Sequence, residues 1–216
     1  MLAHRTSTAL RRAPASQAAP ARPARQLRLQ TRANFVKWLF NGRHSKHWEP
    51  REGSTPRKIS RSGYDVTPLT KEERDERAAA LTPFEQYVVL QAGTERPWTG
   101  QTTNGFSHDN KRRGVYVSAV GGLPLFSSAT KFESGSGWPS FYAPIDPEHV
   151  IEILDTSIPF MPRMEVVDAR SGAHLGHVFN DGPSPTFKRY CINAAALKFV
   201  PEDEELPAES KPVSDN

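Results

Sequence analysis

The second half of the chain consists of short apolar runs separated every few residues by Gly, Pro, Asn or Asp. Runs bounded by such turn signals are typical of β-strands. They predict strands at Val115–Ser118, Leu123–Phe126, Met164–Val167, His177–Phe179 and Tyr190–Phe199. Only residues 147–154 are predicted to form a helix in this region. The pattern therefore predicts a mainly β domain with long loops, capped by a few helices.

Two helix-start signals precede the strands. Thr70-Lys71-Glu72-Glu73 is a capping box, in which a hydroxyl at the N-cap is followed three residues later by a glutamate. Thr82-Pro83-Phe84-Glu85 repeats the box with proline at the first helical position. We expect one helix to about Ala80 and a second that Gly93 stops.

Basic residues are concentrated at the N-terminus. The first 48 residues contain eight Arg and two Lys but no acid, and the remainder contains 18 Lys and Arg against 24 Asp and Glu. The folded part is therefore acidic, and we expect no nucleic-acid partner. A start rich in Arg, Ala, Ser and Pro is typical of an organelle transit peptide, which we place at residues 1–34. A basic arm that binds polyanions is the alternative.

The composition also suggests how the chain is divided. Ser and Thr among abundant Ala favour import into the chloroplast, with the mitochondrion as the alternative. Residues 35–79 are predicted to be a polar linker or loosely docked extension with a short helix, followed by a compact domain at 80–203. The acidic, Pro-bearing residues 204–216 are predicted to be a disordered tail. No run approaches the roughly 18 apolar residues of a membrane span, so no membrane partner is expected.

Cys191 is the single cysteine of the 216 residues. A lone thiol forms neither an internal disulfide nor a thiolate zinc site, so it serves packing or reactivity, and packing is commoner. Two other segments bear on this choice. Lys131–Phe141 places glycines beside Trp138, which suits a ligand-binding wall or a tight turn with a core tryptophan. His174–Pro183 holds two histidines three residues apart, which fits acid–base chemistry, a structural role or part of a metal site.

Three blocks together resemble a known family. Gly-Trp-Pro-Ser-Phe, His-Leu-Gly-His-Val-Phe-Asn-Asp-Gly-Pro and Arg-Tyr-Cys-Ile-Asn, in this order, are similar to the signature blocks of the peptide methionine-R-sulfoxide reductases, the MsrB family. The likeness runs from about Leu81 to Pro201 and includes Thr94-Glu95-Arg96-Pro97. It implies a β-tent of two small antiparallel sheets with short N-terminal helices, and an enzyme that reduces methionine-R-sulfoxide in oxidised proteins to methionine.

The resemblance implies catalytic roles for four residues. Cys191 would attack the sulfoxide sulfur and become a sulfenic acid, with its thiolate favoured by its surroundings. His177, assisted by His174, would donate the proton that the sulfoxide oxygen needs. Asn193 would orient the thiol or an ordered water.

The resemblance also implies a substrate pocket. Trp138 would hold the S-methyl group against its apolar face, which explains the selection of one sulfur epimer. Phe179 and Arg189 would line the same pocket. We expect the enzyme to be a monomer.

The chain departs from the family at two functional positions. Many members bind a structural zinc through two Cys-x-x-Cys pairs, whose places are taken by Ser118, Gly121, Asp168 and Ser171. Without thiolates we expect no zinc and no other cofactor. A resolving cysteine is replaced by Ser136, so an external thiol must recycle the enzyme: glutathione with glutaredoxin, or thioredoxin.

Smaller departures are Phe187, where the family tends to have Gly, and Ala194, where it tends to have Ser. Two other functions compete with the reductase. One is a binding module that keeps the β-tent and has lost catalysis together with zinc. The other is a metal enzyme that uses the two histidines, for which the sequence offers no clear third ligand.

Overall fold

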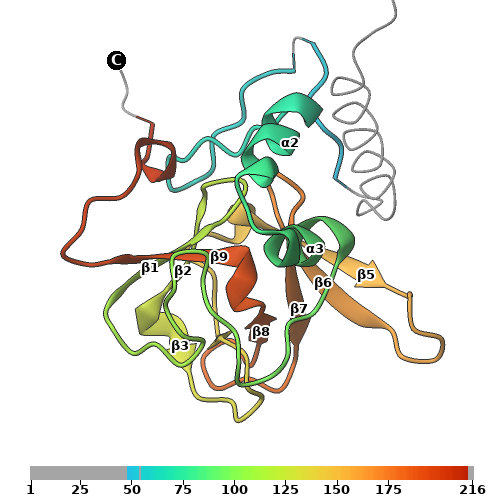
Figure 1. The fold of residues 1–216 in the computed structure, drawn as a ribbon, viewed down its shortest axis with the longest axis vertical. Helices are drawn as coiled ribbons and strands as arrows, with labels where there is room; N and C mark the ends of the chain where they lie inside the picture. Colours follow the sequence, from blue (N-terminus) through green and yellow to red (C-terminus); the bar gives the residue numbers. More distant parts are fainter. Residues whose placement is uncertain (1–47, 54, 214–216) are drawn as a thin grey trace, which may run out of the picture. The chain divides into compact units, whose positions relative to one another are not determined.

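The computed structural model describes residues 48–53 and 55–213, and these residues are shown in colour in Figure 1. The proposed transit peptide at 1–34, the first part of the extension and residues 214–216 lie outside the described residues. Within the described part, no helix is both long and apolar enough to span a membrane.

The described strands form two antiparallel sheets, which confirms the predicted mainly β fold. The first sheet has the order β2 (Pro124–Ser127), β1 (Gly114–Ser118), β9 (Leu197–Pro201). The second has the order β3 (Lys131–Phe132), β4 (Ser140–Phe141), β8 (Arg189–Ile192), β7 (His174–Phe179), β6 (Arg163–Asp168), β5 (Val150–Asp155).

An aromatic cluster joins the two sheets. The ring of Phe141 on β4 stacks on Phe126 of β2 with centroids 4.5 Å apart, and its edge meets Tyr116 of β1 at 5.1 Å. Tyr116 in turn packs on Phe199 of β9. All four side chains are fully buried, so the core lies between the sheets and fixes their relative position.

Two predicted elements differ in the structure. The run expected as one strand at 190–199 is divided by a 3-10 turn, Ala194–Ala196, so that β8 and β9 belong to different sheets. The helix expected at 147–154 is instead a 3-10 turn, Pro147–His149, followed by β5. Residues 150–153 contain three β-branched side chains, which favour a strand paired with β6.

Both predicted capping boxes are present. Helix α2 (Lys71–Ala79) begins at Thr70 and helix α3 (Pro83–Gln91) begins at Thr82, and each hydroxyl accepts a hydrogen bond from the backbone N–H three residues later. Helix α3 contacts β7 and the 3-10 turn at Ala194–Ala196. Ala92, one residue before the expected stop at Gly93, takes the left-handed conformation that ends α3.

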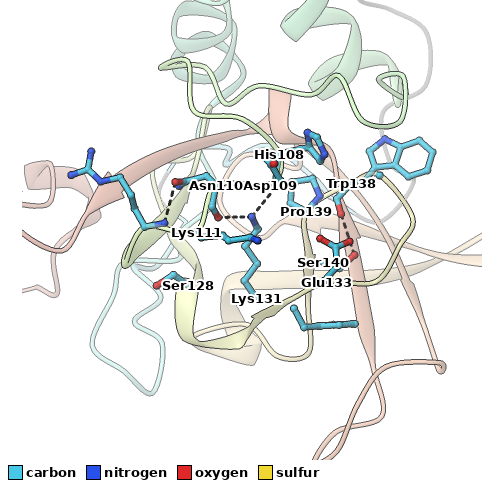
Figure 2. A pocket seen from close by; sticks show the side chains of 13 residues that line it. His108, Asp109, Asn110, Lys111, Ser128, Lys131, Glu133, Trp138, Pro139 and Ser140 are labelled. Carbon is cyan, nitrogen blue, oxygen red and sulfur yellow. Dashed lines mark hydrogen bonds between the residues drawn. The ribbon is translucent and has the colours of Figure 1, made fainter.

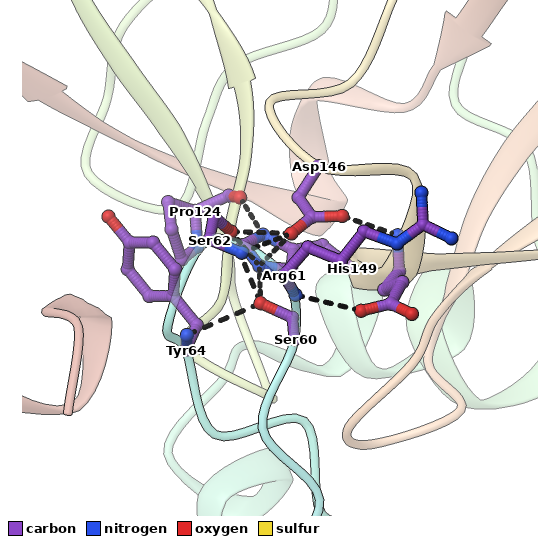
Figure 3. A network of polar contacts seen from close by, with 8 residues as sticks. Ser60, Arg61, Ser62, Tyr64, Pro124, Asp146 and His149 are labelled. Atoms are coloured by element: carbon purple, nitrogen blue, oxygen red, sulfur yellow. Dashed lines mark hydrogen bonds and ion pairs between the residues drawn. The ribbon is translucent and has the colours of Figure 1, made fainter.

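The described part of the extension packs on the sheets rather than forming a free linker. Val66 and Leu69 are buried, and the Leu69 N–H donates to the carbonyl of Arg170. A buried polar network adds a second attachment (Figure 3). In it, Ser60 Oγ lies 3.2 Å from His149 Nε2, while His149 Nδ1 is 2.7 Å from the carbonyl oxygen of Pro124.

The C-terminal residues also differ from their expected disorder. Ser210 is buried and its hydroxyl donates to the Gly122 carbonyl at 2.6 Å. The N–H of Val213 donates to the carbonyl of Gly63 in the extension. Specific hydrogen bonds thus hold residues up to Val213, a constraint that acidic composition alone does not reveal.

Candidate active site

Cys191 lies within β8, between two strands that present side chains to it. In the register of the sheet it is directly opposite His177 of β7 and Ser140 of β4. Directly opposed residues share a face of an antiparallel sheet, with Cβ atoms about 4.5–5.5 Å apart. Glu165 of β6 is opposite His177 and extends the row. The sheet therefore places the thiol beside one of the two histidines predicted from sequence.

Close approach of β7 and β8 depends on a glycine. A Cβ added to Gly176 would overlap the carbonyl oxygen of Cys191, so no larger residue fits without moving a strand. The glycine between the two histidines is thus a steric requirement of the site.

The segment Lys131–Phe141, here called the Trp138 block, contains β4 and lies on the other side of Cys191 from β7. Ser136 Oγ is 3.9 Å from Cys191 Sγ, and Ser134 Oγ lies 2.8 Å from both Ser136 Oγ and Ser140 Oγ. The Trp138 indole N–H donates to the Glu95 carbonyl at 3.2 Å, which fixes the ring. The serine predicted to replace a resolving cysteine therefore contacts the thiol.

Each histidine is held by a carboxylate that the sequence did not identify. His177 Nε2 lies 2.9 Å from Asp155 Oδ2, and His174 Nδ1 lies 2.7 Å from Glu165 Oε1. Their ring centroids are 5.5 Å apart. The other ring nitrogen of His174, Nε2, is buried and has no hydrogen-bond partner among the described residues. The two carboxylates orient the histidine rings, and His174 Nε2 remains available to bind a ligand.

Burial favours the neutral forms of both His177 and Cys191. It lowers the pKa of His177, although the hydrogen bond to Asp155 acts in the opposite direction. It raises the pKa of the Cys191 thiol, and the contacts with Ser136 and Arg189 only partly oppose it. We expected surroundings that favour the thiolate, whereas the site favours the thiol because desolvation exceeds the attraction of one guanidinium.

Asp155 itself remains ionised. Burial alone would raise its pKa, but hydrogen bonds from Ser157, His177 and Arg163 together hold the pKa of this carboxyl well below its usual value. Arg163 Nη2 donates to Asp155 Oδ2 at 2.7 Å. A charged carboxylate therefore faces His177 over the whole neutral range.

Arg189 is positioned by two contacts. Its guanidinium makes a paired hydrogen bond with the Asp181 carboxylate, at 2.9 and 2.8 Å, and stacks 4.5 Å from the centre of the Phe179 ring. Phe179 and Arg189 are also opposite each other in the register of β7 and β8. The two residues predicted to line the pocket thus lie together beside the thiol.

Asn193 lies beyond the end of β8 and is buried. Its side chain accepts from the Glu95 N–H at 3.1 Å and donates to the Leu175 carbonyl at 3.1 Å. Glu95, also buried, accepts from the N–H groups of Ala194 and Ala195. Among the described residues, both side-chain hydrogen bonds of Asn193 are to backbone groups and neither is to the thiol. Glu95, whose carbonyl holds Trp138, is a site residue for which the sequence suggested no role.

Comparisons with known proteins agree with this site. A family model described as the SelR domain matches residues 81–201, which include every site residue named above. The chain is 48% identical over 149 residues to a peptide methionine sulfoxide reductase MsrB of Caulobacter vibrioides, covering 69% of this chain and 90% of the relative. This chain belongs to the MsrB family. It is also 50% identical over 141 residues to an MsrB of Methanosarcina barkeri, covering 65% and 95% of the two chains.

A plant relative is similar over a shorter stretch. The chain is 56% identical over 119 residues to the chloroplastic peptide methionine sulfoxide reductase B1 of Arabidopsis thaliana, which covers 55% of this chain and 56% of the relative.

The four positions where many MsrB proteins bind zinc meet in space. Ser118 Oγ donates to Asp168 Oδ2 at 2.7 Å, and Ser171 Oγ donates to the same oxygen. A Cβ added to Gly121 would overlap Asp168 Oδ2. These residues do not fit a thiolate zinc site, because their hydroxyls and carboxylate already satisfy one another and one position has no side chain. Within the described residues, no group of three His, Cys, Asp or Glu side chains could hold a metal ion.

A cleft of about 290 Å³ is lined in part by the Trp138 block, including Trp138 and Ser140 (Figure 2). Lys131 lies at its wall and donates to the carbonyls of His108 and Asn110, each at 2.7 Å. Burial lowers the pKa of Lys131 to about 8. Cys191 and the two site histidines do not line this cleft, so the reductase chemistry is not assigned to it.

Proposed function

We propose that this MsrB-family enzyme reduces methionine-R-sulfoxide in oxidised proteins by direct attack of Cys191 on the sulfoxide sulfur. The observation that carries the proposal is the placement of the single thiol beside His177 across β7 and β8. The family match and the relatives' names support the reductase activity.

The proposed reaction balances within the site. The sulfoxide S–O bond breaks and an S–O bond forms on Cys191, so the methionine sulfur is reduced by two electrons and the cysteine sulfur is oxidised by two. The thiol proton ends on the oxygen as part of the sulfenic acid. The products are methionine and the Cys191 sulfenic acid.

The histidines are proposed to handle the proton and the oxygen. His177, held by Asp155, is opposite the thiol and would move the proton between sulfur and oxygen. The free Nε2 of buried His174 would bind the sulfoxide oxygen when that nitrogen carries a proton. Trp138, fixed through its indole N–H, would provide the apolar face for the S-methyl group.

An external thiol is proposed to regenerate the enzyme. Ser136 contacts Cys191 but cannot form a disulfide, and the chain has no second cysteine. One thiol would displace water from the sulfenic acid to give a mixed disulfide, and a second would release Cys191 as a thiol. Glutathione with glutaredoxin, or thioredoxin, would supply this pair of electrons.

We also propose that the enzyme works without zinc, because the Asp168 cluster occupies the place of the thiolates. Elemental analysis of the purified chain should find much less than one zinc per chain. A stoichiometric zinc that chelators remove together with the folded structure would contradict this proposal.

Import into the chloroplast is proposed from the basic, acid-free N-terminus and from the chloroplastic relatives. Fusion of residues 1–48 to a fluorescent reporter tests it, and mitochondrial fluorescence would favour the alternative.

The central experiment follows reduction of dabsylated methionine-R-sulfoxide with dithiothreitol as the electron donor. We expect turnover by the wild-type chain and none above background by Cys191→Ser, because serine cannot form the sulfenic acid. The S epimer serves as the specificity control. If wild type and Cys191→Ser both reduced the substrate only at the background rate, the result would instead favour an inactive binding module.

A further inference from the structure

The hairpin that joins β5 and β6 exposes an unusual amount of apolar surface. The exposed fractions are 42% for Ile158, 106% for Phe160 and 58% for Met161. We call these three side chains the hairpin surface. Contiguous apolar side chains left in water usually mark a binding site, whereas scattered single ones do not.

Phe160 is also held in an unfavourable backbone conformation. The Met161 N–H donates to the Ile158 carbonyl at 3.2 Å, which closes a turn with Pro159 and Phe160 at its centre. Phe160 has φ of +62°, the left-handed region that the third position of a type II turn requires and that glycine occupies most readily. The turn therefore keeps a bulky aromatic ring in water at a position suited to glycine, a combination that fold stability does not explain.

The hairpin surface begins at the active site. Asp155, the last residue of β5, contacts His177, and Arg163, the first residue of β6, contacts Asp155. β5 is the edge strand of its sheet, and Figure 1 shows the hairpin projecting beyond β7. A peptide whose methionine sulfoxide reaches Cys191 would therefore have its neighbouring residues close to the hairpin surface.

The chemistry of the hairpin selects an apolar partner. Residues 156–162 contain no charged side chain, and Pro159 and Pro162 have no N–H with which to pair an added strand. Methionine is mostly buried in native proteins, and its oxidation disrupts cores. The neighbours of an oxidised methionine in a loosened protein are therefore often exposed apolar residues.

We propose that the hairpin surface binds apolar residues that flank methionine sulfoxide in unfolded segments of substrate proteins. This inference rests on the proposed function and specifies its substrate class. The surface would discriminate between substrates by their sequence neighbours, while the reaction at Cys191 stays the same.

The test uses Phe160→Gly, because glycine suits the positive φ and removes the ring. Three substrates are compared: free methionine-R-sulfoxide, an oxidised peptide with Leu and Phe on both sides of the sulfoxide, and the same peptide with Ser and Gly flanks. We expect kcat/KM for the apolar peptide to fall about tenfold, mainly through KM, which corresponds to the loss of about 55 Å² of apolar contact. The other two substrates should be unaffected, and the melting temperature should not fall.

A matched control and a binding measurement complete the design. Ile59→Ser removes another exposed apolar side chain, in the extension, and should leave all three rates unchanged. Fluorescence anisotropy with the inactive Cys191→Ser chain measures peptide affinity without turnover. There too, adding Phe160→Gly should weaken binding of the apolar peptide about tenfold and spare the polar one.

Several results would overturn the inference. Unchanged binding and turnover of the apolar peptide would show that the hairpin surface does not dock substrate. An equal loss for all three substrates would mean that the hairpin acts through Asp155 and His177. A dimer that Phe160→Gly dissociates would assign the surface to a second copy of the chain. Failure of the proposed function is distinct, since it would abolish wild-type turnover while leaving the anisotropy result intact.

Discussion

Replacing Asp168 by alanine should destabilise the fold strongly although the residue is remote from the thiol. Asp168 is the fully buried last residue of β6, and its Oδ2 accepts from the hydroxyls of Ser118 and Ser171. Its Oδ1 accepts from the Arg170 N–H at 3.0 Å. The alanine variant leaves three buried or partly buried donors without this acceptor.

The magnitude follows from these contacts. Each buried donor left unsatisfied costs about 1–3 kcal/mol, and water entering the vacated space offsets part of the cost. We therefore expect the free energy of unfolding to fall by about 4 kcal/mol. For a domain of this size the melting temperature should fall by roughly 8–16 °C. Asp168→Asn should lose only about 1–2 kcal/mol, because its amide oxygen still accepts from the two hydroxyls while its NH₂ faces the Arg170 N–H.

Urea unfolding followed by circular dichroism measures these differences. Asp75→Ala is the control, since Asp75 is an exposed helix residue paired with Lys71 and should change stability by less than about 1 kcal/mol. A loss of less than about 1 kcal/mol for Asp168→Ala would refute the idea that this hydrogen-bonded cluster braces the turns.

Three further predictions concern the thiol and its loop. Phe187 has φ of +56°, so Phe187→Gly should raise the free energy of unfolding by about 1 kcal/mol in the same urea assay; a loss of stability would show that its ring makes a necessary contact. Ser136→Cys should let the oxidised enzyme close an internal disulfide, seen by mass spectrometry as a loss of two hydrogens, whereas wild type should gain one oxygen or a thiol adduct. The kcat/KM of wild type should be level from below pH 6.5 to above pH 9, because burial lowers the His177 pKa from 6.5 and raises the Cys191 pKa from 9.0. A steep change inside that range would contradict it.

The alternation of short apolar runs and turn signals was enough to predict a mainly β fold, but not where strands change sheets. The run at 190–199 breaks because buried Asn193 binds the backbone at Glu95 and Leu175, contacts from distant parts of the chain. The run at 147–154 is ambiguous by composition, and pairing with β6 makes most of it a strand.

The site was predictable only in part for the same reason. Resemblance pointed to Cys191 and His177, and the sheet register shows them opposite each other. Asp155 and Glu165 were missed, because single acids in strands carry no local signal and meet the histidines only through strand pairing. The direction of the Cys191 pKa shift was also missed, since sequence shows the nearby Arg189 but not the burial that outweighs it.

That shift changes how the thiol must react. With the pKa of Cys191 raised and that of His177 lowered, Cys191 rests as the thiol and His177 as the neutral imidazole. In the proposed reaction the sulfoxide oxygen takes up one proton to become the hydroxyl of a sulfenic acid, and the resting thiol already carries such a proton. In the proposed mechanism, His177 would take the proton from the thiol only when the sulfoxide oxygen is present to receive it. Burial therefore limits the exposure of a free thiolate to oxidants between turnovers, which suits an enzyme whose only cysteine has no partner for a protective disulfide.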